Sequence, residues 1–172
     1  MHFRRSALRL LCGLALVALA VGACSRPSIL RLKIQDVSAQ PGDEGLRVPL
    51  ELDNRGVGPV RAIQIALRYD PELIEIVQVQ RTTRAEVLSH FDYNVPAPGD
   101  LRMAILDLGT NVLKPGTGPV AELVIRVSRD AEVGAEALLA FVVEGAARTE
   151  VLDRQGDSYP LEVEDGRVSV GG

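Results

Sequence analysis

Side chains suited to nucleophilic or acid–base chemistry are scarce in this chain of 172 residues. It has two cysteines, Cys12 and Cys24, and two histidines, His2 and His90. A Ser-His-Asp arrangement would have to use His90, because His2 lies in the N-terminal leader, and no nucleophile motif stands near His90. We therefore interpret His90 as a loop histidine and expect no enzymatic activity.

Carboxylates are plentiful, with 23 Asp and Glu residues, and two of them could in principle hydrolyse a glycosidic bond. The candidate groups are Glu72 with Glu75, and Glu162 with Glu164 and Asp165. Charges in such strand-like segments are usually solvated, and at sheet edges they block unwanted strand pairing. The acids therefore add no argument for catalysis.

Metal binding has one weak candidate, the segment 153–157, which places acidic side chains around Gly156. It lacks the spacing and the distal glutamate of a calcium loop, so we interpret it as a turn between two strands. We expect no cofactor. A structural calcium ion stays open at this level, because its oxygen ligands can come from loops that are distant in the sequence.

The first 23 residues have the features of a signal peptide. Arg4, Arg5 and Arg9 form a positively charged start, and the apolar stretch 10–23 that follows is fourteen residues long. A membrane-spanning helix needs about 20 apolar residues, so this stretch is too short to span a bilayer. We expect residues 1–23 to be removed from the mature protein.

The end of this segment, Leu19-Ala20-Val21-Gly22-Ala23-Cys24, resembles a bacterial lipobox. The resemblance implies cleavage before Cys24 and acylation of its thiol; the alternative is a secretory peptide with a chance cysteine. Each buried acyl methylene contributes about 0.8 kcal/mol, so two or three chains would hold the protein to a membrane. We predict a lipoprotein of the bacterial cell envelope. Ser25, in place of Asp, favours the outer membrane if the cell is Gram-negative.

Cleavage would leave one domain, residues 29–172, behind a tether of residues 24–28. At about 3.4 Å per residue, that tether keeps the domain close to the bilayer. Cys24 would be the only cysteine left, so no disulfide can form within the mature chain. The mature chain would carry 16 Lys and Arg against 23 Asp and Glu, which argues against nucleic acid and anionic lipid surfaces as partners.

The mature chain is patterned almost throughout as short strands separated by turns. In the segment 62–69, Ile63, Ile65 and Leu67 alternate with smaller or polar residues, a period of two that predicts a half-buried strand. Further strands are expected at 30–34, 48–52, 73–79, 91–95, 101–108, 120–127, 137–143 and 167–170. Only 81–89 has helical character. This pattern predicts an all-β protein, an antiparallel β-sandwich of eight or nine strands.

An ordered set of landmarks resembles the cohesin domain, the sandwich module with which scaffolding proteins dock enzymes. The landmarks are Gln40-Pro41-Gly42-Asp43, Val48-Pro49-Leu50, the segment 63–77 with Asp70-Pro71, Gly99-Asp100-Leu101-Arg102, Gly118-Pro119-Val120-Ala121-Glu122-Leu123 and Asp165-Gly166-Arg167-Val168-Ser169-Val170. The resemblance covers 30–170. It implies a nine-stranded jelly roll, a non-catalytic role and a partner called dockerin.

In cohesins the partner binds one flat sheet, and the strand that resembles 62–68 lies in it. The outward positions predicted for this partner-binding face are Ala62, Gln64, Ala66 and Arg68, with Asp92, Asn94, Arg102 and Ala104 on neighbouring strands. Cellulosomal cohesins carry polar residues such as Asn and Asp where Ala62 and Gln64 stand. This chain departs from that pattern, which puts recognition of a standard dockerin in question.

Direct carbohydrate binding is the alternative function, because cohesins share their sandwich with cellulose-binding modules. Sugar-binding faces need flat aromatic platforms, but aromatic residues are only 3% of the chain and Trp is absent. Tyr69 and Phe141 are expected in the core, which leaves Tyr93 and Tyr159 as candidate exposed rings. Protein docking needs no such platform. The sequence therefore favours capture of a protein, either dockerin-bearing or another envelope protein, in a setting such as polysaccharide breakdown.

Overall fold

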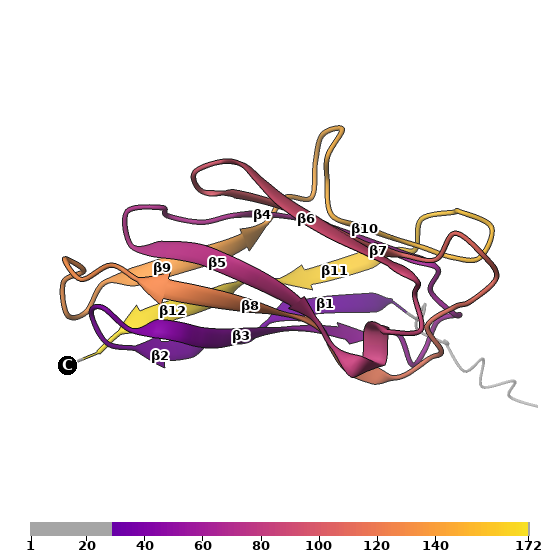
Figure 1. Ribbon diagram of the computed structural model, residues 1–172. Coiled ribbons are helices and arrows are strands. Elements are labelled where there is room, and N and C mark those ends of the chain that lie inside the picture. The colour runs from indigo at the N-terminus through magenta and orange to yellow at the C-terminus, as the bar shows by residue number, and fades with distance from the viewer. Residues whose placement is uncertain (1–28, 172) are drawn as a thin grey trace, which may run out of the picture.

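The computed structural model describes residues 29–171, whose regular secondary structure is almost entirely β-strand (Figure 1). The strands are β1 (Leu30–Ile34), β2 (Val37–Ala39), β3 (Glu44–Asp53), β4 (Ala62–Arg68), β5 (Ile74–Arg81), β6 (His90–Ala97), β7 (Asp100–Leu106), β8 (Thr117–Val127), β9 (Glu136–Phe141), β10 (Glu150–Leu152), β11 (Leu161–Glu164) and β12 (Gly166–Val170). The predicted signal peptide, the lipidation site Cys24 and the tether 24–28 lie outside the described residues.

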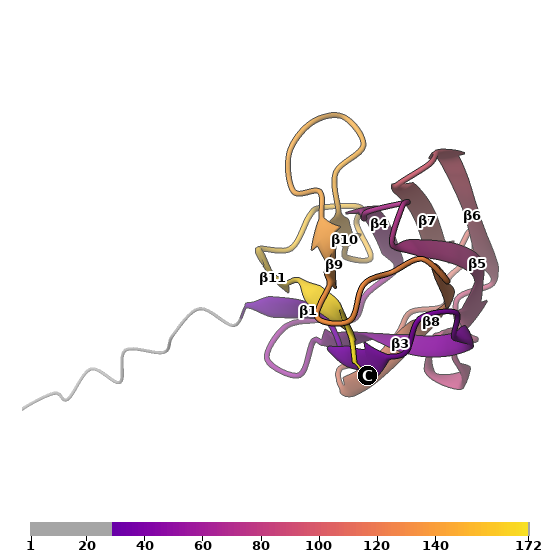
Figure 2. The ribbon, with the colours of Figure 1, turned by 90° about the vertical axis from the view of Figure 1, so that its left-hand side faces the viewer.

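Two sheets pack face to face as a sandwich (Figures 1 and 2). One sheet has the order β11-β1-β3-β8-β5 and the other β2-β12-β9-β4-β7-β6, with β10 pairing β4 beyond the end of β9. Two pairs, β1 with β11 and β2 with β12, are parallel, and the other pairs are antiparallel. The predicted all-β sandwich is therefore confirmed. No helix in the described residues is long and apolar enough to cross a membrane.

The strand count differs from the predicted nine, because β2, β10 and β11 were not expected. These strands are three or four residues long, too short for an alternating pattern to stand out. The segment 81–89 forms one short 3₁₀ helix, η1 (Thr83–Ala85), rather than two helical turns. Ala85 and Leu88 are both buried there, so the segment closes the end of the sandwich.

The core between the sheets is aliphatic and follows the alternation of the strands. In β4 the inward residues Ile63, Ile65 and Leu67 are fully buried, and the inward residues of β1, β3, β7 and β8 pack against them. Burying one such side chain contributes about 1.5–3 kcal/mol. Tyr69 packs at the margin of this core and Phe141 lies inside it, as predicted.

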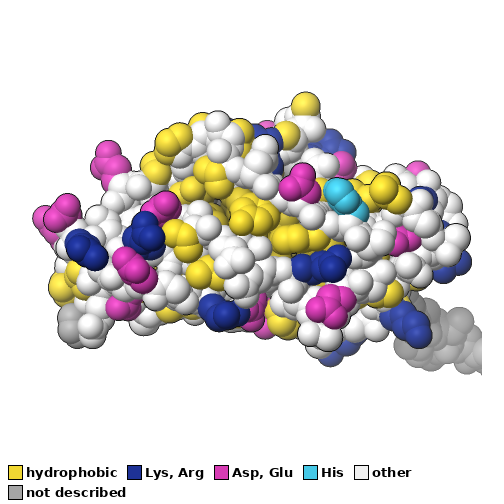
Figure 3. All heavy atoms as spheres, in the orientation of Figure 1, with side chains coloured by type: hydrophobic (Ala, Val, Ile, Leu, Met, Phe, Trp, Pro, Cys, Tyr) yellow, Lys and Arg dark blue, Asp and Glu magenta, His cyan; other side chains and the backbone are white. Residues whose placement is uncertain are grey.

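One long side of the sandwich is closed, because two chain segments pass from one sheet to the other there. These are the connections from β1 to β2 and from β11 to β12. Gly166 is required at the second, since a Cβ at this position would lie 2.5 Å from Cγ2 of Ile34. The opposite side is open between the edge strands β5 and β6, and Figure 3 shows hydrophobic side chains along it.

Both open edges carry features that discourage pairing with another strand. In β5 the register shifts between Ile76 and Gln78, which leaves Val77 as a bulge. In β6 the carboxylate of Asp92 accepts the N–H of Tyr93 at 2.9 Å, and Pro96 has no N–H to donate. The open side is therefore a poor template for strand addition.

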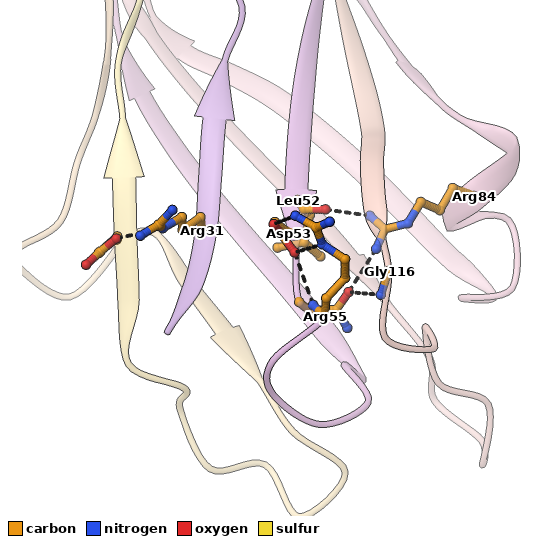
Figure 4. Close-up of polar contacts among 8 residues, drawn as sticks. Arg31, Leu52, Asp53, Arg55, Arg84 and Gly116 are labelled. Carbon is orange, nitrogen blue, oxygen red and sulfur yellow. Dashed lines mark hydrogen bonds and ion pairs between the residues drawn. The ribbon is translucent and has the colours of Figure 1, made fainter. Parts of the chain in front are cut away.

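A buried polar network ties β3, β8 and η1 together at one end of the sandwich (Figure 4). The Arg84 guanidinium donates to the carbonyl oxygens of Leu52 and Gly118, both at 3.0 Å, and to Oδ1 of Asn54 at 2.8 Å. The same Oδ1 accepts the N–H of Gly116 at 3.0 Å. Burial lowers the pKa of Arg84 from its ordinary value, because it disfavours the charged form.

Replacing Asn54 by alanine should destabilise the domain by about 2 kcal/mol, because Arg84 and the N–H of Gly116 both lose their acceptor. The measurement is the midpoint of urea unfolding. The matched control is Asn111→Ala, because Asn111 is exposed and its side chain makes one bond of 3.3 Å to Asp107. The control should change stability by less than about 0.5 kcal/mol. Equal midpoints for the two variants would contradict a stabilising role for the network.

Candidate partner-binding face

The eight residues predicted for partner binding lie on the outer face of one sheet, on the adjacent strands β4, β7 and β6. The pairing register aligns six of them in two rows across these strands. One row is Gln64, Ala104 and Asp92, and the next is Ala66, Arg102 and Asn94. Ala62 and Arg68 flank the rows at the two ends of β4.

The same six residues line a shallow hollow of about 270 Å³, which is bounded on one side by Ala147. Asp92 and Asn94 are exposed at its β6 margin, whereas Gln64, Arg102 and Ala104 are half-buried. The structure thus groups residues that are up to 40 positions apart in the sequence into one concave surface. A face with small side chains at its centre and polar groups at its margin is suited to close approach of a protein partner.

The prediction that Ala66 is open to solvent is wrong, because its exposed fraction is 1%. Its side chain is turned away from the core, as the alternation of β4 requires, but the neighbouring chain covers it. The hydroxyl of Thr149 accepts the N–H of Ala66 at 3.1 Å and donates to its carbonyl at 3.0 Å. Thr149 thereby fills a gap in the ladder where neither β9 nor β10 pairs with β4.

A loop of residues 143–148 rises above this face between β9 and β10 (Figures 1 and 2). Its base is closed by the N–H of Thr149, which donates to the carbonyl of Val142 at 2.6 Å. Nε2 of Gln64 donates to the carbonyl of Arg148, and Nη1 of Arg102 donates to the carbonyl of Ala147, both at 3.1 Å. Two predicted contact residues therefore hold the loop in place.

The sequence reasoning missed this loop. The strand predicted at 137–143 ends at Phe141, and the chain leaves the sheet two residues earlier than expected. The signal that could have located the loop is Gly145, which adopts a φ of 89°, a conformation that favours glycine. The contacts that Gln64 and Arg102 make with the loop leave no pattern in the local sequence, because they join residues at least 45 positions apart.

The charge at the centre of the face is nearly balanced. The Arg102 guanidinium makes two parallel bonds of 3.0 Å to the carboxylate of Asp100. These bonds, with a smaller contribution from Arg68, hold the pKa of the Asp100 carboxyl below its ordinary value. The charges of Arg68 and Asp92 have no ion-pair partner within residues 29–171, so they are available to a partner at the margin.

The outer face of the other sheet has a different character, since cross-strand ion pairs cover it. Examples are Arg31 with Glu162 at 2.8 Å, Arg47 with Glu122 at 2.6 Å and Arg126 with Glu75 at 2.8 Å. A larger hollow of about 450 Å³ lies on this face, but paired charges form most of its walls. Exposed pairs contribute about 0–1 kcal/mol each and keep such a surface hydrated. The β4–β7–β6 face is therefore the candidate docking surface.

The candidate sugar-binding rings are not displayed on the docking face. Tyr93 turns inward and packs against the core beside Phe91, with ring centroids 6.0 Å apart. Tyr159 is half-buried, and its hydroxyl donates to the carbonyl of Pro59 at 3.1 Å. Neither ring forms an aromatic platform on the outer face of β4, β7 and β6.

The other residues that the sequence suggested for metal binding or catalysis do not lie together in one site within residues 29–171. Within residues 29–171, no group of three or more His, Cys, Asp or Glu side chains could hold a metal ion together. The segment 153–157 is a turn, as interpreted, in which Asp153 accepts the N–H groups of Gln155 and Asp157 at 2.8 and 2.9 Å. His90 is exposed as the first residue of β6, so its interpretation as a loop histidine is wrong.

The two-layer sandwich with one hollowed sheet face of nearly balanced charge defines a class of recognition module. A sequence model of the cohesin domain matches residues 30–153, and the chain belongs to the cohesin domain family. Cohesin domains are non-catalytic binding modules. A comparison with curated protein sequences gave no match.

Solved cohesin structures share this fold. CaCohA2 from Clostridium acetobutylicum is 21% identical with a TM-score of 0.70, covering 86% of this chain and 94% of its own. The OlpA cohesin of Clostridium thermocellum, in a type I cohesin–dockerin complex, is 20% identical with a TM-score of 0.68, covering 83% and 99%. A non-cellulosomal cohesin from the archaeon Archaeoglobus fulgidus is 19% identical with a TM-score of 0.66, covering 84% and 92%.

Replacing Thr149 by valine should destabilise the domain by about 1–3 kcal/mol, because the N–H of Ala66 would remain buried without its acceptor. Thr149→Ser is the matched control, since serine keeps the hydroxyl and should retain most of the stability. Urea unfolding of both variants is the measurement. If the valine variant is as stable as the serine variant, the hydroxyl does not bridge the gap beside β4.

Proposed function

We propose that this protein is a non-catalytic, membrane-anchored binding module that captures a protein partner on the outer face of β4, β7 and β6. The observation that carries the proposal is the grouping of six predicted contact residues in one hollow on β4, β7 and β6, three strands that no ion pair joins to one another within residues 29–171. A dockerin-bearing protein is the first candidate partner, because several similar solved structures are cohesin–dockerin complexes. Enzymes of polysaccharide breakdown are one setting for such a partner.

The shape of the face favours a partner element that lies along the hollow between loop 143–148 and β6. Ala104 at the centre lets a partner backbone come close, because its side chain is small. Asp92 and Asn94 offer hydrogen-bonding groups on one margin, and Arg68 offers a cation at the end of β4. Gln64 and Arg102 act through the loop that they hold. Direct glycan binding is not proposed, because this face lacks an aromatic platform.

The anchoring part of the proposal rests on the lipobox-like segment that ends at Cys24. An acylated Cys24 would place the domain in the cell envelope of a bacterium, at the outer membrane if the cell is Gram-negative. Two or three acyl chains bind a bilayer stably, whereas one binds only marginally.

Ala104→Arg should weaken binding of a dockerin at least 100-fold, because the long cation would fill the hollow without disturbing the core. Affinity is measured by calorimetry against a panel of purified dockerin domains. Gln78→Arg is the control, since Gln78 is exposed on the outer face of the other sheet, and it should bind like the wild type. A dockerin that binds both variants equally well would show that the face is wrongly assigned.

Mass spectrometry of the mature N-terminus should find an acylated Cys24 when the full chain is made in a bacterium that processes lipoproteins. The variant Cys24→Ser should lack the acyl chains and leave the membrane fraction. A mature N-terminus at any other residue would contradict the lipid anchor while leaving the docking face untouched.

A further inference from the structure

The end of the sandwich where the described chain begins gathers four loops. Pairing places Arg31 of β1 opposite Asp53 at the end of β3, and Ala62 at the start of β4 opposite Leu106 at the end of β7. The loops 54–61, 82–89, 107–116 and 153–160 therefore lie at the end from which β1 starts (Figure 1). We refer to these loops as the N-terminal end.

Leu108 on loop 107–116 is the most exposed large hydrophobic side chain of the described residues, with an exposed fraction of 76%. Its loop is held firmly at its base. Asp107 is buried and accepts the N–H of Asn111 at 2.8 Å and that of Ser89 at 3.3 Å. Leu113 exchanges two backbone hydrogen bonds with Val60. The fixed base presents Leu108 to the surroundings.

In the four loops of the N-terminal end, cations slightly outnumber acids. The four loops contain five Lys and Arg against four Asp and Glu, whereas residues 29–171 as a whole contain 15 against 23. Of the four acids, Asp107 is buried and Asp153 accepts two N–H groups of its own turn, whereas Glu86 and Asp157 are exposed. Of the five cations, Arg55 pairs with Asp53 at 2.6 Å and Arg84 donates to Asn54. Lys114 and Arg154 are exposed and have no ion-pair partner within residues 29–171.

We propose that the N-terminal end is a membrane-facing surface that rests on an anionic bilayer, with Leu108 at the headgroup region and Lys114 and Arg154 facing lipid phosphates. The inference rests on the lipid anchor at Cys24 proposed above. Residues 24–28 can span at most about 17 Å, so of the two ends of the sandwich this one faces the bilayer. Exposed cations near an anionic leaflet and an apolar side chain at the interface both favour that orientation.

This proposal departs from the expectation, based on net charge, that anionic lipid is no partner. Most of the excess of acids lies outside the four loops, whose own formal net charge is +1. With that end on the bilayer, the strands point away from the membrane. The docking face of β4, β7 and β6 is then reached from the side.

The chain contains no Trp, so the fluorescence of a single introduced Trp reports the surroundings of that residue alone. Leu108→Trp places the probe at the N-terminal end. Val133→Trp is the matched control, since Val133 is 67% exposed in the loop between β8 and β9 at the opposite end. Acylated full-length variants are reconstituted in phosphatidylcholine–phosphatidylglycerol vesicles that contain brominated lipid. We expect at least threefold stronger quenching of Trp fluorescence in Leu108→Trp than in Val133→Trp.

Equal quenching of the two variants, or none in either, would overturn the proposal. The vesicles are isolated by flotation before measurement. Floated protein without selective quenching in Leu108→Trp would overturn this inference alone. Failure of the acylated protein to float would contradict the proposed anchor and this inference together.

A second experiment tests the contribution of the two cations, Lys114 and Arg154, to this orientation. Adding Lys114→Glu and Arg154→Glu to Leu108→Trp should reduce the quenching by at least half, because anionic lipid would then repel the N-terminal end. Arg129→Glu in the same background is the control, since Arg129 is exposed at the opposite end. Undiminished quenching after the double reversal would overturn the role of the two cations.

Discussion

The alternation of β4 is the constraint on which the rest of the structure depends. Ile63, Ile65 and Leu67 are held in the core between the sheets, and because side chains alternate along a strand, the intervening residues must point outward. A shift of one residue would expose the aliphatic row and bury Arg68, so the register is strongly specified. Pairing with β7 on one edge and with β9 and β10 on the other then fixes the whole docking face.

The two outer faces of the sandwich differ in their side chains. One carries cross-strand ion pairs such as Arg31 with Glu162 and stays hydrated. The other has small residues at its centre and a loop at its margin, and two of the polar residues that line the hollow, Gln64 and Arg102, hold that loop. The shape of this face is therefore set by a tertiary contact as well as by the sheet.

The sequence predicted the long strands and the placement of the face, because both follow from local alternation and from proline and glycine at turns. It could not predict β2, β10 and β11, whose few residues depend on partners far along the chain. It also could not predict the burial of Ala66, because that depends on Thr149, 83 residues away. The helical pattern at 81–89 corresponds in the structure to a single 3₁₀ turn, which places Arg84 against the ends of β3 and β8.

The central claim is that the outer face of β4, β7 and β6 captures a protein. Hydrogen–deuterium exchange of the domain with and without a bound dockerin tests it most directly, because exchange reports every surface at once. The account predicts new protection confined to these three strands and loop 143–148. Protection of β1, β3 and β8 with none at β4, β7 and β6 would contradict it.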